Sequence, residues 1–175
     1  MFESFDQSFN KVKQFHSLMD GTTQESPIRY SHQQAIHRAD FKLEEIVEFI
    51  YAASNSDAAF EESMGELHAA LDRAKEKVKQ NGSPQSTLLG QVDALMDLLY
   101  FTYGSFVLMG VDPAPIFTIV HQANMGKIFP DGKAHFDPVT HKILKPDDWE
   151  ERFSPEPLIA KELENQLRIS EMRNE

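Results

Sequence analysis

The chain has 175 residues, of which 41% are hydrophobic and 26% charged, which is the size and composition of one globular domain. Seventeen Lys and Arg residues against 28 Asp and Glu residues give a net charge of −11, which argues against duplex nucleic acid as a partner because phosphates attract cations. No apolar run approaches the roughly 20 residues that span a bilayer, so we expect neither an integral membrane protein nor a membrane partner. The chain has no cysteine and its first residues show no signal-peptide pattern, so we expect a cytoplasmic protein.

Helix start signals recur along the sequence. Ser31 precedes a long periodic segment, and Ser83-Pro84 and Asp112-Pro113 each combine an N-cap residue with proline at the first helical position. These signals, together with the apolar periodicity, predict helices over 4–19, 31–54, 57–80, 84–109, 113–124 and 155–172. We expect the last of them to pack on the bundle or on another subunit.

Helix stop signals and turn residues fill the intervals. Gly110 and Gly126 each follow a predicted helix, where a left-handed glycine commonly closes the last turn. Residues 20–30 have the composition of a loop, and the helical period fails over 127–146, where Pro130–Lys133 predicts a turn. The sequence therefore predicts a single all-α domain over 1–175, a four-helix bundle with a short hairpin or ordered loop before its last helix.

The segment 31–54 carries a group of acidic residues. Leu43, Ile46, Val47 and Ile50 follow the spacing of one core-facing stripe. Three glutamates lie roughly opposite that stripe. At 100° per residue the last of them lies about 40° from the first and about 60° from the second, so that all three can project into one region. They are Glu44, Glu45 and Glu48. A charge cluster of this kind is often only a solvated helix face.

The segment 88–109 is apolar nearly all round, which is typical of a buried bundle helix. Asp93 and Asp97 are its only charged residues and lie one turn apart, and Tyr100 continues their strip. Burying two carboxylates without partners costs several kcal/mol each, so they need protons, basic partners or a metal ion. If the five acids face one another across a helix pair, Mg²⁺, Mn²⁺ or Ca²⁺ suits such an all-oxygen ligand set.

The acidic cluster is also compatible with two alternatives to such a site. Arg38, Lys42 or histidines can neutralise it as a purely structural feature. A di-iron carboxylate bundle also directs glutamates inward, but it uses Glu-x-x-His on two helices, and none of the seven histidines has Glu three residues before it.

The ordered set of motifs resembles the all-α nucleoside triphosphate pyrophosphohydrolases, which include MazG-like enzymes, phosphoribosyl-ATP pyrophosphohydrolase and the dimeric dUTPases. The resemblance runs from Val12 to about Trp149. Residues 37–48 resemble the family's Glu-Glu-x-x-Glu helix, and residues 92–104 its second acidic helix. The family's second motif is often Glu-x-x-Asp, whereas position 94 is Ala here and the acids are spaced Asp-x-x-x-Asp. Residues 124–127, 131–133 and 142–146 are similar to those of a MazG-like subgroup.

This resemblance implies a divalent-metal-dependent enzyme that cleaves nucleoside triphosphates between the α- and β-phosphates. Glu45, Glu48, Asp93 and Asp97 are then the expected ligands of Mg²⁺, for which Mn²⁺ can substitute. Glu44 and Glu45 are the candidate catalytic residues that orient or deprotonate the attacking water. The expected substrate contacts are Asn124, Lys127 and Tyr100, with the ammonium of Lys127 suited to a phosphate.

Three functions follow as alternatives. The first is a pyrophosphohydrolase that acts on nucleoside triphosphates, house-cleaning or dUTPase-like. The second is phosphoribosyl-ATP hydrolysis at the same site, and the third is a non-catalytic helical interaction module whose acidic cluster is structural. The resemblance and the apolar C-terminal helix together predict a homodimer or homotetramer.

Overall fold

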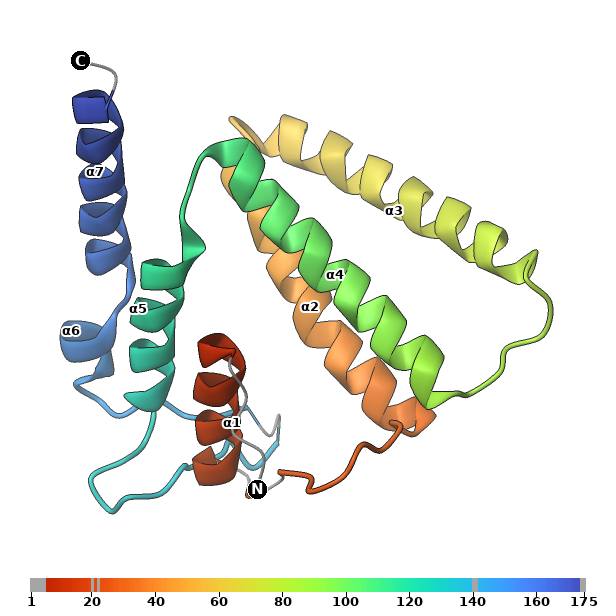
Figure 1. The fold of residues 1–175 in the computed structure, drawn as a ribbon, viewed down its shortest axis with the longest axis horizontal. Helices are drawn as coiled ribbons and strands as arrows, with labels where there is room; N and C mark the ends of the chain where they lie inside the picture. Colours follow the sequence, from red (N-terminus) through yellow and green to blue (C-terminus); the bar gives the residue numbers. More distant parts are fainter. Residues whose placement is uncertain (1–5, 20, 22, 140–141, 174–175) are drawn as a thin grey trace. The chain divides into compact units, whose positions relative to one another are not determined.

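The computed structural model describes residues 6–19, 21, 23–139 and 142–173, and these residues form an all-α fold (Figure 1). In chain order its helices are α1 (Gln7–Met19), α2 (His32–Ala53), α3 (Asp57–Lys79), α4 (Leu88–Met109), α5 (Pro113–Met125), α6 (Trp149–Phe153) and α7 (Glu156–Arg173). The predicted fold class is confirmed. The six predicted helices are found with small shifts of their ends, and α6 is an addition.

Two of the predicted start signals are confirmed, and a third is wrong. Ser31 forms a capping box with Gln34, in which each side chain accepts a hydrogen bond from the other's backbone N–H. Asp112 caps α5 through the Ala114 N–H. By contrast, α4 starts at Leu88 and not at 84, because the Thr87 side chain accepts the Gly90 N–H at 3.1 Å and so serves as the cap.

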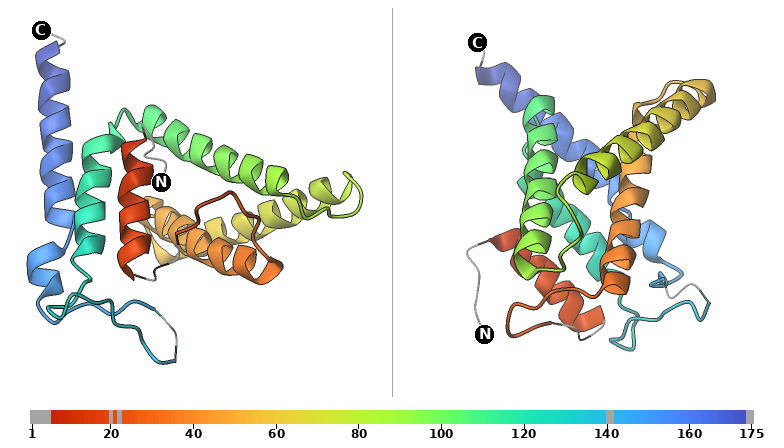
Figure 2. Two further views of the ribbon diagram at one scale, coloured as in Figure 1. Left: turned by 60° about the horizontal axis from the view of Figure 1, so that its bottom comes forward. Right: turned by 90° about the vertical axis from the view of Figure 1, so that its right-hand side faces the viewer.

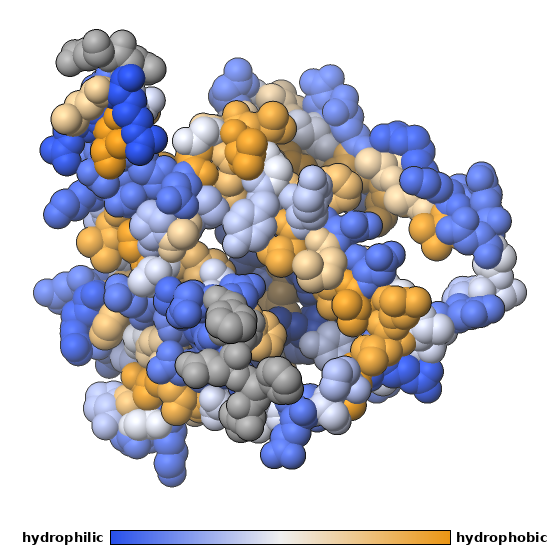
Figure 3. Space-filling view, in the orientation of Figure 1, coloured by the Kyte–Doolittle hydropathy of each residue, from blue (hydrophilic) through white to orange (hydrophobic). Residues whose placement is uncertain are grey.

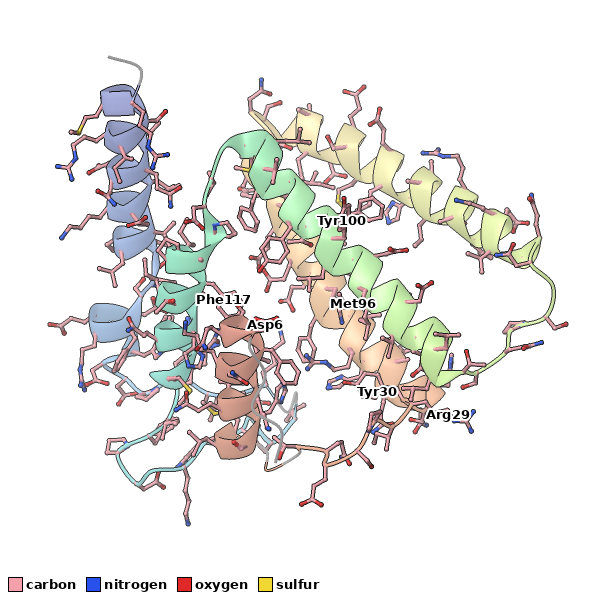
Figure 4. The ribbon with its side chains drawn as sticks, viewed as in Figure 1. Asp6, Arg29, Tyr30, Met96, Tyr100 and Phe117 are labelled. Carbon is pink, nitrogen blue, oxygen red and sulfur yellow. The ribbon has the colours of Figure 1, made fainter. Side chains whose placement is uncertain are left out.

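The start of α1 differs from the prediction because Asp6 caps that helix (Figure 4). Its carboxylate accepts the backbone N–H groups of Ser8 and Phe9, and α1 begins at Gln7. The predicted first residues of this helix, 4 and 5, lie outside the described part of the chain. In the predicted loop over 20–30, the described residues are non-helical.

The chain divides into two compact units, 1–26 together with 96–175, and 27–95. The division falls within α4, between Leu95 and Met96. That the whole chain is one domain stays a prediction. In the first unit, α5 lies between α1 and α7 and packs against both (Figures 1 and 2). In the second unit, α2 packs against α3.

Side-chain contacts hold α5 to both of its neighbours. The ammonium of Lys11 on α1 donates to the Thr118 hydroxyl at 3.0 Å. The amide of Gln166 on α7 clasps the backbone of Asp112, accepting its N–H at 2.8 Å and donating to its carbonyl at 3.0 Å. These contacts confirm that the C-terminal helix packs on the bundle.

Few side chains are buried in the described chain. The buried hydrophobic ones are Met19, Ala123 and Trp149, all in the first unit, and no described residue of 27–95 is buried. The prediction of a buried helix over 88–109 is therefore wrong for the single chain, since Leu89, Tyr100 and Leu108 on α4 are 79%, 76% and 91% exposed. Apolar side chains lie at the surface along the course of α4 (Figure 3).

The helix α4 is also long and apolar enough to cross a membrane, judged by length and composition alone. The core helix of a globular protein can have the same length and apolar composition. This property therefore shows that α4 has an apolar surface, but it does not identify what covers that surface. The expectation that no segment reaches this length and apolarity does not hold for α4.

Candidate functional site

The three glutamates of α2 lie on the exposed part of that helix. Glu44, Glu45 and Glu48 are all exposed, whereas Val47 and Ile50 of the predicted core stripe are half-buried. Leu43 and Ile46 remain 41% and 36% exposed, so the stripe is only partly covered in the single chain. Burial thus distinguishes only Val47 and Ile50 of the predicted apolar stripe from the acidic residues of this helix.

A basic and aromatic turn precedes the glutamates on α2. The His37 and Phe41 rings meet edge to face with centroids 4.9 Å apart, and the Arg38 guanidinium lies 5.4 Å from the Phe41 centroid. Lys42 folds back so that its ammonium donates to the Arg38 carbonyl at 2.8 Å. Partial burial, and then the nearby positive charge of Arg38, lower the pKa of Lys42 below its ordinary value. This turn places cationic groups about one helical turn from the acids.

The two aspartates of α4 are exposed as well, on a helix whose apolar side chains are also exposed. Asp93 belongs to the unit 27–95 and Asp97 to the other unit, although one unbroken helix carries both. Their spacing keeps them on one face of that helix, about one turn apart. The expected substrate residue Tyr100 follows on the same strip and meets the Phe101 ring edge to face at 6.3 Å.

Within the described residues, no group of three or more His, Asp or Glu side chains comes close enough to hold a metal ion. The assignment of Glu45, Glu48, Asp93 and Asp97 as ligands therefore stays a prediction. The residue types fit Mg²⁺, because all four supply carboxylate oxygens and their exposure leaves room for waters and substrate phosphates to complete the shell.

The start of α4 is tied to the segment that leads into α2 (Figure 4). The Gln91 side chain accepts the Tyr30 N–H at 2.8 Å and donates to the Tyr30 carbonyl at 3.1 Å. The Arg29 guanidinium donates to the Ser86 carbonyl at 2.7 Å, just before α4 begins. Sequence reasoning gave none of these residues a role. The paired bonds fix the first turns of both acid-bearing helices within the unit 27–95.

The expected substrate residues Asn124 and Lys127 are joined at the end of α5. The Lys127 ammonium donates to the Asn124 side-chain oxygen at 2.8 Å, and the Asn124 amide donates to the Val120 carbonyl at 3.2 Å. Both residues are half-buried. The predicted pair is thus brought together, with the Asn124 side chain fixed at both of its polar atoms.

Gly126 between them does not adopt the predicted left-handed conformation. Its φ of −64° and ψ of −10° are right-handed, whereas Gly110 does close α4 with φ of 70°. The structure gives a different reason for glycine at this position, since the Phe153 ring of α6 occupies the space that a Cβ on Gly126 would need.

The short helix α6, missed by sequence reasoning, completes the end of α5. The buried indole of Trp149 donates to the Ala123 carbonyl at 2.9 Å. The other three carbonyls of the last four helical residues of α5 accept N–H groups of Gly126, Lys127 and Ile128. All four carbonyl groups left without a helical partner are thereby satisfied. The sequence signal for α6 was two acids in a first turn, Glu150 and Glu151, with aromatics at 149 and 153.

The described residues of the predicted non-helical segment 127–146 form a loop with an isolated antiparallel bridge between Phe136 and Ile143. The His135 ring stacks on Phe129 with centroids 4.2 Å apart, and its Nε2 lies 2.9 Å from the Asp131 carboxylate. The hydrogen bond from His135, and then that from the Lys133 N–H, lower the pKa of Asp131. Residues 140 and 141 at the tip lie outside the described part.

Comparison with known proteins places the chain among nucleotide hydrolases. Residues 12–124 match the model of a family described as phosphoribosyl-ATP pyrophosphohydrolase. A crystal structure from Exiguobacterium sp. 255-15, of a protein provisionally described as an NTP pyrophosphohydrolase, aligns with a TM-score of 0.85 and 36% identity. The alignment covers 94% of this chain and 98% of that one. No curated protein matches the sequence at a significant level.

The family match ends at Asn124, so that Lys127, the loop 127–146 and α6 lie beyond it. Both acidic helices lie within it. The motifs, the helical architecture and the structural likeness agree on the same group of enzymes. The chain belongs to the all-α NTP pyrophosphohydrolase superfamily, in the family described as phosphoribosyl-ATP pyrophosphohydrolase, and is an enzyme of pyrophosphohydrolase type.

Proposed function

We propose that this protein is a divalent-metal-dependent nucleoside triphosphate pyrophosphohydrolase that releases a nucleoside monophosphate and pyrophosphate. The observation that carries the proposal is the pair of acidic helices, α2 and α4, in a chain of this family. Their five carboxylates are exposed and supply the oxygen donors that Mg²⁺ or Mn²⁺ takes.

The metal is proposed to be held by Glu45, Glu48, Asp93 and Asp97. When bound, Mg²⁺ offsets the charge of the triphosphate and lowers the pKa of a water molecule. Glu44, next to these ligands in sequence, is proposed to accept a proton from the attacking water or to orient it. A chain of net charge −11 repels a polyanion, so substrate binding at an acidic site depends on such neutralisation.

The substrate is proposed to contact the pair at the end of α5. The Lys127 ammonium is a cation suited to a phosphate oxygen, and the Asn124 amide can both donate to and accept from a sugar or base. Their mutual hydrogen bond prepares the pair before substrate arrives. Tyr100, 76% exposed on α4, offers a ring on which a base can stack.

Phosphoribosyl-ATP is the second candidate substrate, favoured by the description of the matching family. A panel of canonical, deoxy and damaged nucleoside triphosphates plus phosphoribosyl-ATP separates the two, with pyrophosphate and orthophosphate measured separately. Metal-dependent release of pyrophosphate supports the proposal. Release of orthophosphate alone refutes the reaction, and no turnover with any substrate favours the non-catalytic helical module.

The role of Asp97 is tested by Asp97→Asn, which removes a charge and nearly preserves shape. If Asp97 is a metal ligand, the variant loses most activity while its stability without metal holds or rises, because one repelling charge is gone. If Asp97 is instead paired with a buried cation, the same change destabilises the metal-free protein by about 3 kcal/mol or more. Melting curves without metal distinguish the two cases.

A second copy of the chain is proposed to cover α4. A helix that is apolar all round belongs in a core, and the described part of the unit 27–95 buries no residue of its own. Packing of a second copy against α4 would bury the exposed apolar side chains of this helix and would place protein around Asp93 and Asp97. A homodimer is the smallest such assembly, and a homotetramer repeats the contact.

The assembly is tested with Leu108→Glu, since Leu108 is 91% exposed in the single chain. The matched control is Met172→Glu on α7, where the side chain is 71% exposed. We expect light scattering to give an oligomer for the wild type and the control, and a smaller species for Leu108→Glu. A monomeric wild type contradicts the proposal, and flotation of the wild type with phospholipid vesicles indicates that lipid covers α4 instead.

A further inference from the structure

The contact between α6 and the end of α5 has a feature that packing alone does not require. The Trp149 indole bonds to the carbonyl of Ala123, the residue immediately before Asn124, and the Phe153 ring lies against Gly126, the residue immediately before Lys127. Trp149, Ala123 and Gly126 are buried. Both anchoring points therefore adjoin the two expected substrate residues.

We infer that α6 positions the Asn124–Lys127 pair for the nucleotide, with Trp149 and Phe153 as its positioning residues. The inference rests on the proposed function, because it takes Asn124 and Lys127 as the substrate contacts. Neither aromatic side chain needs to touch the substrate for this role. They act by holding the backbone from which Asn124 and Lys127 project.

The carbonyl of Ala123 depends on a donor from outside α5. It lies in the last turn of that helix, where helical N–H partners run out, and the indole N–H takes the place of the missing donor. Without this bond the buried carbonyl loses its partner, and the turn has to move to find water or another donor. Such a movement displaces Asn124, the next residue.

Gly126 provides the second anchoring point. Its lack of a side chain lets the Phe153 ring approach the backbone closely, on the same short helix as Trp149 and one turn later. The turn Asn124–Lys127 is thus held from two points of one rigid element. The hydrogen bond between Lys127 and Asn124, 2.8 Å long, depends on both residues keeping this spacing.

The helix α6 is itself held in place by the end of the preceding loop. The Lys145 ammonium lies 3.9 Å from the centroid of the Trp149 ring and pairs with Glu150 at 2.8 Å. The Trp149 backbone N–H donates to the Pro146 carbonyl, and Arg152 pairs with Asp148. The loop that follows Lys127 therefore returns to the end of α5 and closes onto it.

The test uses Trp149→Phe in the full chain, which removes the indole N–H and keeps an aromatic ring in the site. We expect the KM for the preferred nucleoside triphosphate to rise by about tenfold and kcat to change less than about twofold, as for a displaced binding group. The control is Met19→Ala, which removes a buried side chain of α1 and should lower stability without this rise in KM.

A double-mutant cycle with Asn124→Ala then separates positioning from general destabilisation. If Trp149 acts through Asn124, Trp149→Phe adds little to the KM of Asn124→Ala, whereas two independent effects multiply. Multiplying effects overturn the inference, as does an unchanged KM in Trp149→Phe. If the wild type releases pyrophosphate from no substrate in the panel, both the proposed function and this inference are refuted. If the wild type is active but the KM of Trp149→Phe is unchanged, only the inference is refuted.

Discussion

The packing of α6 on α5 leads to a prediction about Gly126→Ala. A Cβ at this position would lie 2.7 Å from Cδ1 and Cδ2 of Phe153 and closer still to Cγ, whereas carbon atoms in contact prefer about 3.5–4.0 Å. Cγ is the atom that joins the ring to the side chain, so turning the ring about its own axis does not relieve the clash. The Phe153 side chain or the whole of α6 has to retreat.

The expected cost follows from three contributions. Overpacking of this kind costs about 1–3 kcal/mol, and a retreat of α6 weakens the bond from Trp149 to Ala123, worth about 1 kcal/mol. Against these, alanine reduces the freedom of the unfolded chain by about 0.4–1 kcal/mol, and the right-handed φ of Gly126 imposes no strain on it. We expect a net destabilisation of about 2 kcal/mol, which lowers Tm by about 4–8 °C.

The assay is urea unfolding followed by circular dichroism and by the fluorescence of Trp149, the one tryptophan of the chain. In a Phe153→Ala background the added methyl group has room, so Gly126→Ala should then be neutral or stabilising. A second control is Gly65→Ala on α3, which meets nothing within 4 Å and should stabilise by about 1 kcal/mol. If Gly126→Ala behaves like Gly65→Ala, the close contact with Phe153 does not exist in solution.

Two further predictions concern metal and pH. Saturating Mg²⁺ or Mn²⁺ at 100 times its Kd should stabilise the folded protein by about 2.7 kcal/mol, and equal melting temperatures with metal and with chelator would contradict the metal site. Partial burial, and then the charge of Lys11, lower the pKa of His121 from 6.5, so its neutral form is favoured in the folded state. The contribution of neutral His121 to the free energy of unfolding is fully present above pH 6.5 and is lost as the pH falls below that value. The melting temperature should therefore fall more steeply toward pH 5 in the wild type than in His121→Gln. Parallel curves would show that His121 does not contribute.

The helices were predictable where their signals are local. The capping box at Ser31 and the Asp-Pro start at Asp112 lie within a few residues of the turns that they stabilise, so the sequence shows both partners. The start of α4 was misplaced because Ser83 and Thr87 are both competent caps, and the choice depends on contacts that the sequence does not reveal. One such contact is the bond from Arg29 to the Ser86 carbonyl, which joins residues 57 positions apart.

The sequence suggests the residue types of the candidate site, whose roles stay predictions, and the structure shows only part of their arrangement. The pairing of Asn124 with Lys127 spans three residues, and a helical turn brings such neighbours together. The role of α6 was not predictable, because it rests on Trp149 meeting Ala123 across 26 residues of mostly loop chain. A glycine can be required either by a left-handed backbone conformation or by close contact with another side chain, and the sequence does not distinguish the two. The prediction for Gly126 was a left-handed helix end, whereas the structure shows close contact with the Phe153 ring.

The two acids of α4 are the part of the proposed site that depends least on how the chain's units are placed. Asp93 and Asp97 fall in different compact units, yet an unbroken run of helical hydrogen bonds connects them. A helix fixes residues four apart at about 6 Å along its axis and about 40° around it, whatever packs against either end. The three glutamates of α2 are fixed among themselves in the same way. A metal site made from both sets therefore requires only that two rigid acidic faces come together, and the exposed apolar surface of α4 provides a driving force for helices to assemble around it.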